Sequence, residues 1–199
     1  LDRLPEICQE AAELGIKVIA LFPHVEVEHK DDQGKQPLNP ENLICRAISV
    51  IKSLGLDLGI MADVALDPYT SHGHDGVLIN NEIDNDETIK ILVKQAILQA
   101  KCGCDVIAPS DMMDGRIGLI RKALDKEKFK DVSILSYAVK YASSFYGPFR
   151  EAVGTKSKLK KDKKTYQMDY RNSFESFREV GLDLKEGADM VMVKPGMIY

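Results

Sequence analysis

Short apolar runs alternate along this chain with longer stretches whose apolar residues recur at helical spacing. The short runs predict buried strands over residues 16–22, 56–66, 104–110, 132–140 and 189–194. The longer stretches predict helices over residues 40–55, 86–103, 116–126 and 173–187, and residues 1–15 have the pattern of the end of a helix. Continuous apolar strands that alternate with helices are typical of a parallel sheet covered on both faces.

Two nucleotide-binding signatures are missing from this pattern. No glycine-rich dinucleotide motif follows the first expected strand, and the sequence has no P-loop. The pattern therefore favours the α/β class with a (β/α)8 TIM barrel over a doubly wound sheet. A complete barrel takes about 250 residues, whereas this chain has 199 and about five expected strands. We expect one incomplete barrel domain over residues 1–199, with flanking sequence missing or with an open sheet.

Composition and charge narrow the class of protein. The chain carries a net charge of -4 and 44% hydrophobic residues, which is ordinary for a globular protein. Its mild acidity predicts no nucleic acid and no membrane surface as a partner, and no apolar run approaches a membrane span of about 18 residues. The four cysteines lack zinc-site spacing and are expected to be free thiols in a reducing cytoplasm.

Polar residues stand where several of the expected strands end. Lys140 and Lys194 each follow an apolar strand. A single lysine of this kind is usually a solvated strand end or a stem that reaches back to water. Two such lysines in one sheet need another explanation, because lysine is almost never fully buried unless it is paired.

Five motifs, in order along nearly the whole chain, resemble the porphobilinogen synthase family, also called 5-aminolevulinate dehydratase. The motifs are DVALDPYTSHGHDG (63–76), APSDMMDGR (108–116), KYASSFYGPFR (140–150), TYQMD (165–169) and VMVKPG (191–196). The resemblance implies a TIM barrel that condenses two 5-aminolevulinate molecules to porphobilinogen with loss of two waters, early in tetrapyrrole biosynthesis. The family's chains are much longer than this sequence.

By this resemblance, Lys194 and Lys140 form Schiff bases with the ketones of the two substrate molecules. An amine attacks a carbonyl only when it is unprotonated, and a free lysine has a pKa of about 10.4. Burial and a second ammonium nearby both lower that pKa. The resemblance therefore explains why two lysines end buried strands.

The resemblance also suggests how metals are used. Ala65, Asp67 and Asp75 stand where the family's zinc-dependent members carry cysteines, so zinc is not expected. Asp67 and Asp75 are candidate oxygen ligands for a hard cation. His72 and His74 lie in the same segment, and their sequence leaves open whether they are ligands or solvated residues of a loop.

Arg150, Lys163 and Gln167 match the residues that contact the substrate carboxylates in the family. Residues 151–166 include six lysines within nine positions, from 156 to 164. Such a run is usually a solvated loop, and the alternative is a basic lid that closes over an anionic substrate.

Further polar residues at strand ends and on one helix complete the candidate site. Asp63, Ser110 and Asp111 lie at strand ends and are candidate substrate contacts, while Asp111 together with Asp114 also has the character of a polar scaffold. Glu179 matches the family's glutamate for an allosteric Mg²⁺, and Mg²⁺ binds through one or two carboxylates and several waters. Without the resemblance, Glu179 is an exposed glutamate on a helix.

Two other functions remain as alternatives. A class I aldolase-like enzyme also uses a Schiff-base lysine, but it needs only one and does not explain the carboxylate contacts. A truncated barrel could also be a non-catalytic fragment, although both lysines are retained. The resemblance further implies a cytoplasmic homo-oligomer, an octamer in the family, once the chain has its full length.

Overall fold

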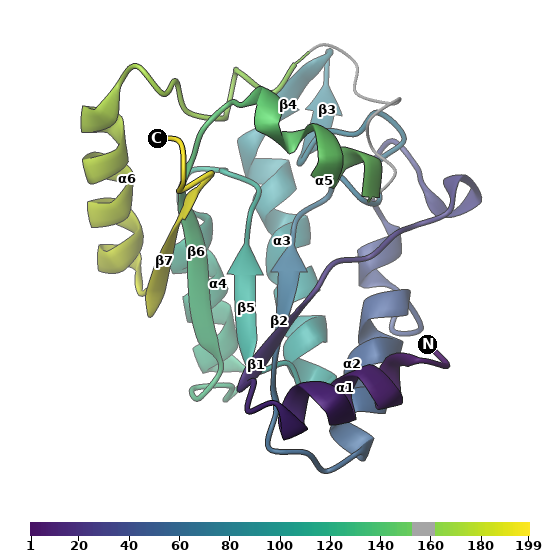
Figure 1. Ribbon diagram of the computed structural model, residues 1–199. Coiled ribbons are helices and arrows are strands. Elements are labelled where there is room, and N and C mark those ends of the chain that lie inside the picture. Colours follow the sequence, from purple (N-terminus) through teal and green to yellow (C-terminus); the bar gives the residue numbers. More distant parts are fainter. Residues whose placement is uncertain (153–161) are drawn as a thin grey trace.

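The computed structural model describes residues 1–152 and 162–199, without the side chains of residues 149 and 150. A five-stranded sheet lies at its centre in the order β1-β2-β5-β6-β7, and every neighbouring pair is parallel (Figure 1). Its strands are β1 (Val18–Leu21), β2 (Gly59–Val64), β5 (Val106–Pro109), β6 (Ser133–Lys140) and β7 (Met190–Lys194). All five strands were predicted from the sequence.

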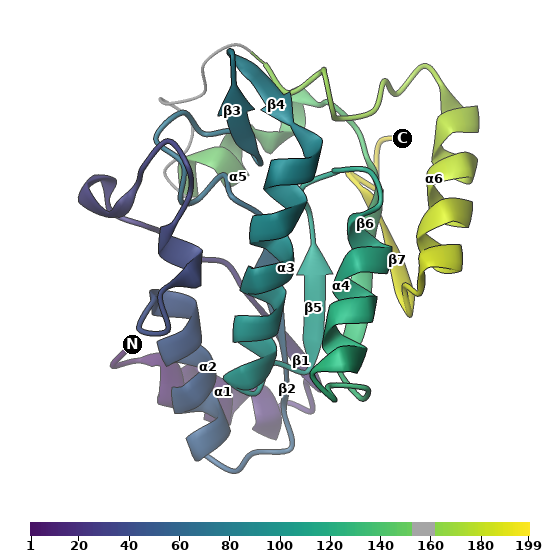
Figure 2. The same ribbon diagram turned by 180° about the vertical axis from the view of Figure 1, so that it is seen from behind.

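The α-helices follow the same sequential order. They are α1 (Leu4–Glu13), α2 (Leu43–Ser53), α3 (Asn85–Lys101), α4 (Arg116–Lys126), α5 (Gly147–Ala152) and α6 (Ser173–Glu186). Helices α2, α3 and α4 lie side by side over one face of the sheet, and α6 lies beside β6 and β7 (Figure 2). A sheet whose strands lie in chain order with helices outside is part of a barrel. The expectation of an incomplete (β/α)8 barrel is therefore confirmed.

The hydrophobic core lies between the sheet and these helices. In β2, Ile60, Ala62 and Val64 are fully buried against residues such as Leu92 of α3. The alternate positions of β2 point to the other face of the sheet, and Asp63 is one of them. Alternation in this strand therefore places a carboxylate on the face that the helices do not cover.

Strand β6 contains an irregularity that matters for the site. Ser136 pairs with Val191 and Val139 pairs with Val193, so β6 has one more residue than β7 across this interval. Such a bulge rotates the residues that follow it relative to the strand's alternation. Ser136 faces the helices, and Lys140, four residues later, points to the opposite side.

Several local features differ from the sequence prediction. A hairpin of β3 (Val77–Ile79) and β4 (Glu82–Asp84) was not predicted, and α5 occupies part of a stretch expected to be irregular. Asn80 and Asn81 both take the left-handed backbone conformation that the two-residue hairpin turn requires. All four cysteines are free thiols, as expected. None of the helices in the described part of the chain is long and apolar enough to cross a membrane.

Candidate active site

Side chains from the carboxyl ends of the parallel strands converge on a small cavity of about 20 Å³. Every strand of the five-stranded sheet contributes to it at or near its end, and the segments on either side of α5 contribute the rest. The lining residues are Phe22, Asp63, Asp67, Ser110, Lys140, Tyr146, Lys163, Gln167 and Lys194. The carboxyl ends of strands are where α/β barrels carry their active sites.

The two strand-end lysines are neighbours across the sheet. Lys140 on β6 pairs in register with Lys194 on β7, and both side chains line the cavity. The bulge in β6 is what allows this, because regular alternation from Ser136 would direct Lys140 toward the helices. The structure thus brings together the two lysines that the sequence singled out.

Lys194 lies against aromatic rings. Its Nζ is 5.1 Å from the ring centre of Tyr137 and 5.6 Å from that of Tyr146, whose hydroxyl donates to the Lys194 carbonyl at 2.9 Å. Burial, and then the positive charge of Lys140, lower the pKa of Lys194 below its ordinary value. A larger fraction of Lys194 is therefore the neutral amine that attacks a carbonyl.

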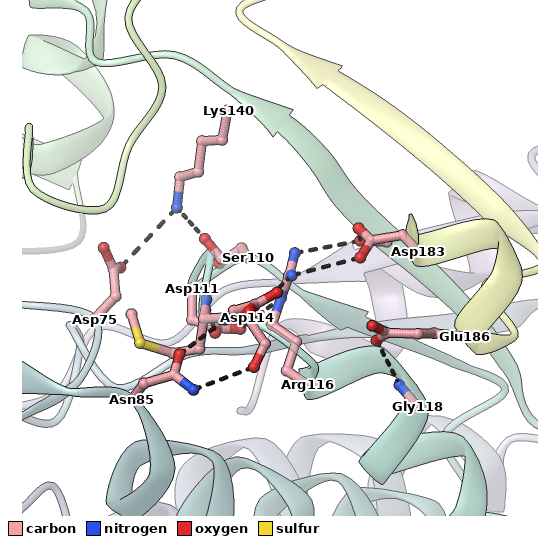
Figure 3. Close-up of polar contacts among 12 residues, drawn as sticks. Asp75, Asn85, Ser110, Asp111, Asp114, Arg116, Gly118, Lys140, Asp183 and Glu186 are labelled. Atoms are coloured by element: carbon pink, nitrogen blue, oxygen red, sulfur yellow. Dashed lines mark hydrogen bonds and ion pairs between the residues drawn. The ribbon is translucent and has the colours of Figure 1, made fainter. Parts of the chain in front are cut away.

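Lys140 has a polar environment instead. This side chain is 7% exposed and its Nζ donates to the carbonyl of Ser110 at the end of β5 (Figure 3). The Asp75 carboxylate lies 4.0 Å from the same Nζ. The two neighbouring lysines therefore differ in their contacts, since Lys140 lies against oxygen atoms and Lys194 is packed against rings.

Lys163 lies between the two aspartates that were candidate metal ligands. Its Nζ is 3.2 Å from Asp67 Oδ2 and 3.0 Å from Asp75 Oδ2, and all three residues are buried. Burial alone would raise the pKa of Asp75, but the positive charges of Lys140 and Lys163 lower this pKa to about 2. Burial raises the pKa of Asp67, and the adjacent Asp75 adds to this effect. An ammonium group thus occupies the position between these carboxylates.

Asp63 is a carboxylate of the cavity with a pKa near neutral pH. Burial, and then repulsion from Asp67, raise the pKa of Asp63 to about 7. Its Oδ1 is buried without a hydrogen-bond partner among the described residues. A carboxyl group with this pKa can both donate and accept a proton at neutral pH.

The two histidines of the 63–76 motif are buried, so the interpretation of them as solvated loop residues is wrong. His72 Nδ1 accepts from the His74 backbone N–H at 3.2 Å, which leaves Nε2 as the donor to the Asp32 carbonyl at 3.3 Å. His74 Nδ1 lies 3.0 Å from the Tyr166 hydroxyl. The His74 bond ties the motif to the segment that carries Lys163, and the His72 bond ties it to the loop that carries Asp32.

Backbone hydrogen bonds attach the segment after residue 161 to the end of β6. The Met168 N–H donates to the Lys140 carbonyl at 2.9 Å, and the Ala142 N–H donates to the Met168 carbonyl at 2.8 Å. Gln167, 5% exposed, is thereby held at the cavity, and its Oε1 has no hydrogen-bond partner within the described residues. The Arg150 side chain and residues 153–161 of the expected lid lie outside the described residues.

Asp111 follows Ser110 but points away from the cavity, to the helix side of the sheet. Its Oδ1 lies 3.3 Å from Arg116 Nε, and Arg116 Nη1 lies 3.8 Å from Asp183 on α6 (Figure 3). Ser136 accepts from Arg116 at 3.3 Å and donates to Asp183 at 2.5 Å. Arg116 is 3% exposed, so this cluster supports the scaffold interpretation of Asp111 rather than substrate contact.

Glu179 lies on α6, one turn before Asp183. Burial, followed by repulsion from Asp183 and Asp114, raises the pKa of Glu179 above its ordinary value. A hydrated divalent cation would relieve this crowding of oxygen donors, so the residues present fit Mg²⁺ held through water. In the described part of the chain, no three His, Cys, Asp or Glu side chains are arranged to hold an ion directly.

Sequence reasoning missed the aromatic and guanidinium groups around these carboxylates and amines. Tyr137 and Tyr146 contact Lys194, Tyr166 contacts His74, and Arg116 joins Asp111 to Asp183. The tyrosines occur in or beside the quoted motifs, which was the available signal. Nothing in a linear sequence indicated that Arg116 would be buried at the start of a helix.

Comparison with known proteins gives a consistent result. A family model described as "Delta-aminolevulinic acid dehydratase" matches residues 1–199. The delta-aminolevulinic acid dehydratase of Bradyrhizobium diazoefficiens is 53% identical over 199 residues, which is 100% of this chain and 56% of that protein. The one from Rhodobacter capsulatus is 56% identical over 170 residues, which is 85% of this chain and 51% of that protein.

A solved structure resembles the whole described fold. It is the delta-aminolevulinic acid dehydratase (porphobilinogen synthase) of Toxoplasma gondii ME49 in complex with the reaction product porphobilinogen. The TM-score is 0.94 at 52% sequence identity, and the match covers 98% of this chain and 56% of that chain. This chain thus spans about half the length of the relatives it matches.

Proposed function

Because this chain belongs to the delta-aminolevulinic acid dehydratase family, we propose that the full-length protein condenses two 5-aminolevulinate molecules to porphobilinogen with loss of two waters. The observation that carries this proposal is the in-register pair of Lys140 and Lys194 at one cavity. A class I aldolase needs only one such lysine, and the family match leaves that alternative without support.

Lys194 is proposed to act as the nucleophile toward the ketone of one substrate. The neutral amine adds to the carbonyl carbon, and loss of water from the adduct gives the Schiff base. The lowered pKa of Lys194, caused by burial and by Lys140, supplies that neutral amine. Lys140 is proposed to bind the second substrate in the same way.

Asp63 is proposed to move protons during these steps. Water leaves the adduct only after its hydroxyl is protonated, and a nearby carboxyl group can donate that proton. Burial and Asp67 raise the pKa of Asp63 to about 7, so protonated and ionised forms coexist at neutral pH. Asp63 and Lys194 both line the cavity.

The substrate carboxylates are proposed to be held by Lys163, Gln167 and Arg150. Lys163 is compensated by Asp67 and Asp75 in the described structure. Burial raises the pKa of Asp67, and once Asp67 is protonated only Asp75 still compensates Lys163, so Lys163 can pair with an incoming carboxylate. Residues 151–166 are proposed to close as a basic lid over the site.

We also propose that Mg²⁺ binds near Glu179 and stimulates the enzyme, and that zinc is not required. The crowding that raises the pKa of Glu179 supports the first part. The ion pairs of Lys163 with Asp67 and Asp75 support the second, because an ammonium already compensates these carboxylates. Replacing Glu179 with Gln should weaken Mg²⁺ binding in calorimetric titrations, whereas Glu10→Gln on α1 should not. Equal Mg²⁺ binding by both variants would place the ion elsewhere.

The remaining properties of the full-length protein are proposals as well. They are a homo-oligomeric state, an octamer by resemblance to the family, and a cytoplasmic location; several relatives are named as chloroplastic. The activity itself is tested by incubating the full-length protein with ¹³C-labelled 5-aminolevulinate and following porphobilinogen by NMR. Formation of porphobilinogen that stops in a Lys194→Met variant supports the proposal. A native, folded protein that leaves the substrate unchanged contradicts it and favours a non-catalytic role.

A further inference from the structure

Helices α3 and α4 lie side by side on the outer, helix-covered side of the sheet (Figure 2). A long apolar groove runs between them. Two adjoining cavities of about 670 and 420 Å³ make it up, and they share Val93, Lys94, Ala123 and Lys126. Helix α2 lies beside α3, and α6 lies beside α4. The two helices that form the walls of the groove, α3 and α4, are therefore the middle members of the described row of helices. The groove is separate from the lysine cavity at the strand ends.

The floor of the groove is apolar and partly open to water. Val93 and Ile97 of α3 are half-buried, and Leu119 of α4 is 50% exposed. Ile89 and Ala123 continue the apolar surface between these residues. An apolar floor between charged rims is the kind of surface on which an amphipathic helix docks.

Lysines form the rim, and three of them have no counter-charge. Lys94, Lys122 and Lys126 make no ion pair or hydrogen bond in the described part of the chain. Two other rim lysines are paired, Lys90 with Glu87 and Lys101 with Glu127. The acidic residues that line the groove are Asp86 and Glu127 at its ends, which leaves the middle positively charged.

The shape of the groove distinguishes between kinds of occupant. Small-molecule sites enclose most of the ligand, whereas this groove is open along its length. From residue 86 to residue 101 the α3 wall is about 22 Å long at 1.5 Å per residue, the length of four helical turns. An amphipathic helix in a groove places apolar residues three and four positions apart along such a floor.

We propose that the α3–α4 groove binds an acidic amphipathic helix of a partner protein. Its apolar residues would pack on Val93, Ile97 and Leu119, and its Asp or Glu side chains would pair with Lys94, Lys122 and Lys126. The positive charge of the rim favours a negatively charged partner, and the apolar floor favours a helix with one apolar face. This inference does not depend on the proposed activity.

The test uses the full-length protein and a fluorescein-labelled helical peptide of about 15 residues, with leucines three and four positions apart and glutamates beside them. A peptide of the same composition in scrambled order is the control for charge alone. Fluorescence anisotropy should show saturable binding of the amphipathic peptide that is at least about tenfold tighter than that of the scrambled one, and that weakens with salt. Equal binding of the two peptides overturns the proposal.

Matched variants locate the binding. The triple change Lys94→Glu, Lys122→Glu and Lys126→Glu should weaken binding about tenfold or more. The control changes Lys35, Lys130 and Lys185 to Glu, which alters net charge equally at exposed positions outside the groove. Binding that falls equally in both triple variants contradicts the groove as the site.

A second pair of variants tests the apolar floor and the alternative occupants. Leu119→Asp should abolish saturable peptide binding, whereas Val27→Asp, at another exposed apolar position, should not. Both proteins are also compared by sedimentation and with anionic phospholipid vesicles. A loss of oligomeric mass confined to Leu119→Asp would identify the groove as an interface between copies of this chain. Vesicle binding that Leu119→Asp abolishes, without peptide binding, would identify a membrane-facing surface; either result overturns the proposal.

Discussion

Two clusters of buried charge lie on opposite sides of β6, and they are built from different cations. On the cavity side, Lys140 and Lys163 face Asp75, and Lys163 also contacts Asp67. On the helix side, Arg116 joins Asp111 to Asp183 (Figure 3). Arginine stays protonated in proteins, whereas the pKa of lysine shifts readily on burial.

The difference separates side chains with shifted pKa values at the cavity from a cluster built on a permanent cation. The cavity side holds groups whose protonation can change, with burial and Lys140 lowering the pKa of Lys194 and burial raising the pKa of Asp63 to about 7. On the helix side, burial raises the pKa of Asp111 to about 6 against the opposing charge of Arg116. Arg116 itself cannot exchange a proton and Asp111 lies away from the cavity, so we assign this cluster a positioning role.

Strand β6 and its neighbour β5 connect the two clusters. Ser110 accepts from Lys140 through its carbonyl, and the next residue, Asp111, binds Arg116. On β6, Ser136 contacts Arg116 and Asp183, while Lys140 reaches the cavity past the bulge. The guanidinium cluster therefore holds the two strand ends that position Lys140.

Breaking the scaffold should have the largest effect on stability. Arg116→Met leaves Asp111 and Asp183 buried without a cation, and removal of one partner of a buried ion pair costs about 3–5 kcal/mol. We expect a clear fall in the unfolding midpoint in denaturant. Arg121→Met on the same helix, whose ion pair with Asp125 is at the surface, should cost about 1 kcal/mol or less. Equal losses in the two variants would contradict the scaffold role.

Changing the cavity-side cation should affect substrate binding in addition to stability. Lys163→Arg keeps the charge and should retain substrate binding, whereas Lys163→Gln should raise KM about tenfold or more because a charged contact to a carboxylate is lost. Lys164→Gln is the matched control, since Lys164 is exposed and contacts Asp162. Steady-state kinetics on the full-length protein measure this. Similar KM values for Lys163→Gln and Lys164→Gln would remove Lys163 from the binding site.

The titration of Asp63 gives a smaller, pH-dependent effect. Burial and Asp67 raise its pKa from 3.8 to about 7 in the folded protein. The folded protein thus binds this proton more tightly than the unfolded chain, so the stability from Asp63 is complete below about pH 4 and is lost as pH rises through about 7. Asp63→Asn has no proton to lose, so its Tm should rise relative to that of the native protein between pH 5 and 8. A Tm difference that is constant with pH contradicts the raised pKa.

The sequence predicted the strands and the convergence of their ends, because buried parallel strands leave a strong pattern of consecutive apolar residues. Lys140 and Lys194 could be assigned to one rim for the same reason. The side to which Lys140 points could not be predicted, since nearly all of β6 is buried and the bulge that rotates it leaves no periodic signal. The ion pairs of Lys163 join residues nearly a hundred positions apart, so spacing could not indicate them.

The burial of the two histidines also could not be predicted from the local sequence. His72 and His74 lie in a segment rich in turn-forming residues, which is typical of an exposed loop. Both rings are buried, and they form hydrogen bonds with Asp32 and Tyr166, which are distant in sequence. A local pattern cannot show whether a distant part of the chain will cover a loop.

The central claim, that Lys194 and Lys140 are a reactive pair, is tested most directly by trapping the Schiff bases. The full-length protein is incubated with 5-aminolevulinate and borohydride, digested, and mapped by mass spectrometry, with Lys194→Met and Lys140→Met as variants. Our account predicts a reduced adduct at Lys194, at Lys140 or at both, and none at exposed lysines such as Lys164. Adducts found only at other lysines would contradict it. So would an adduct yield in the Lys194→Met, Lys140→Met double variant equal to that of the native protein.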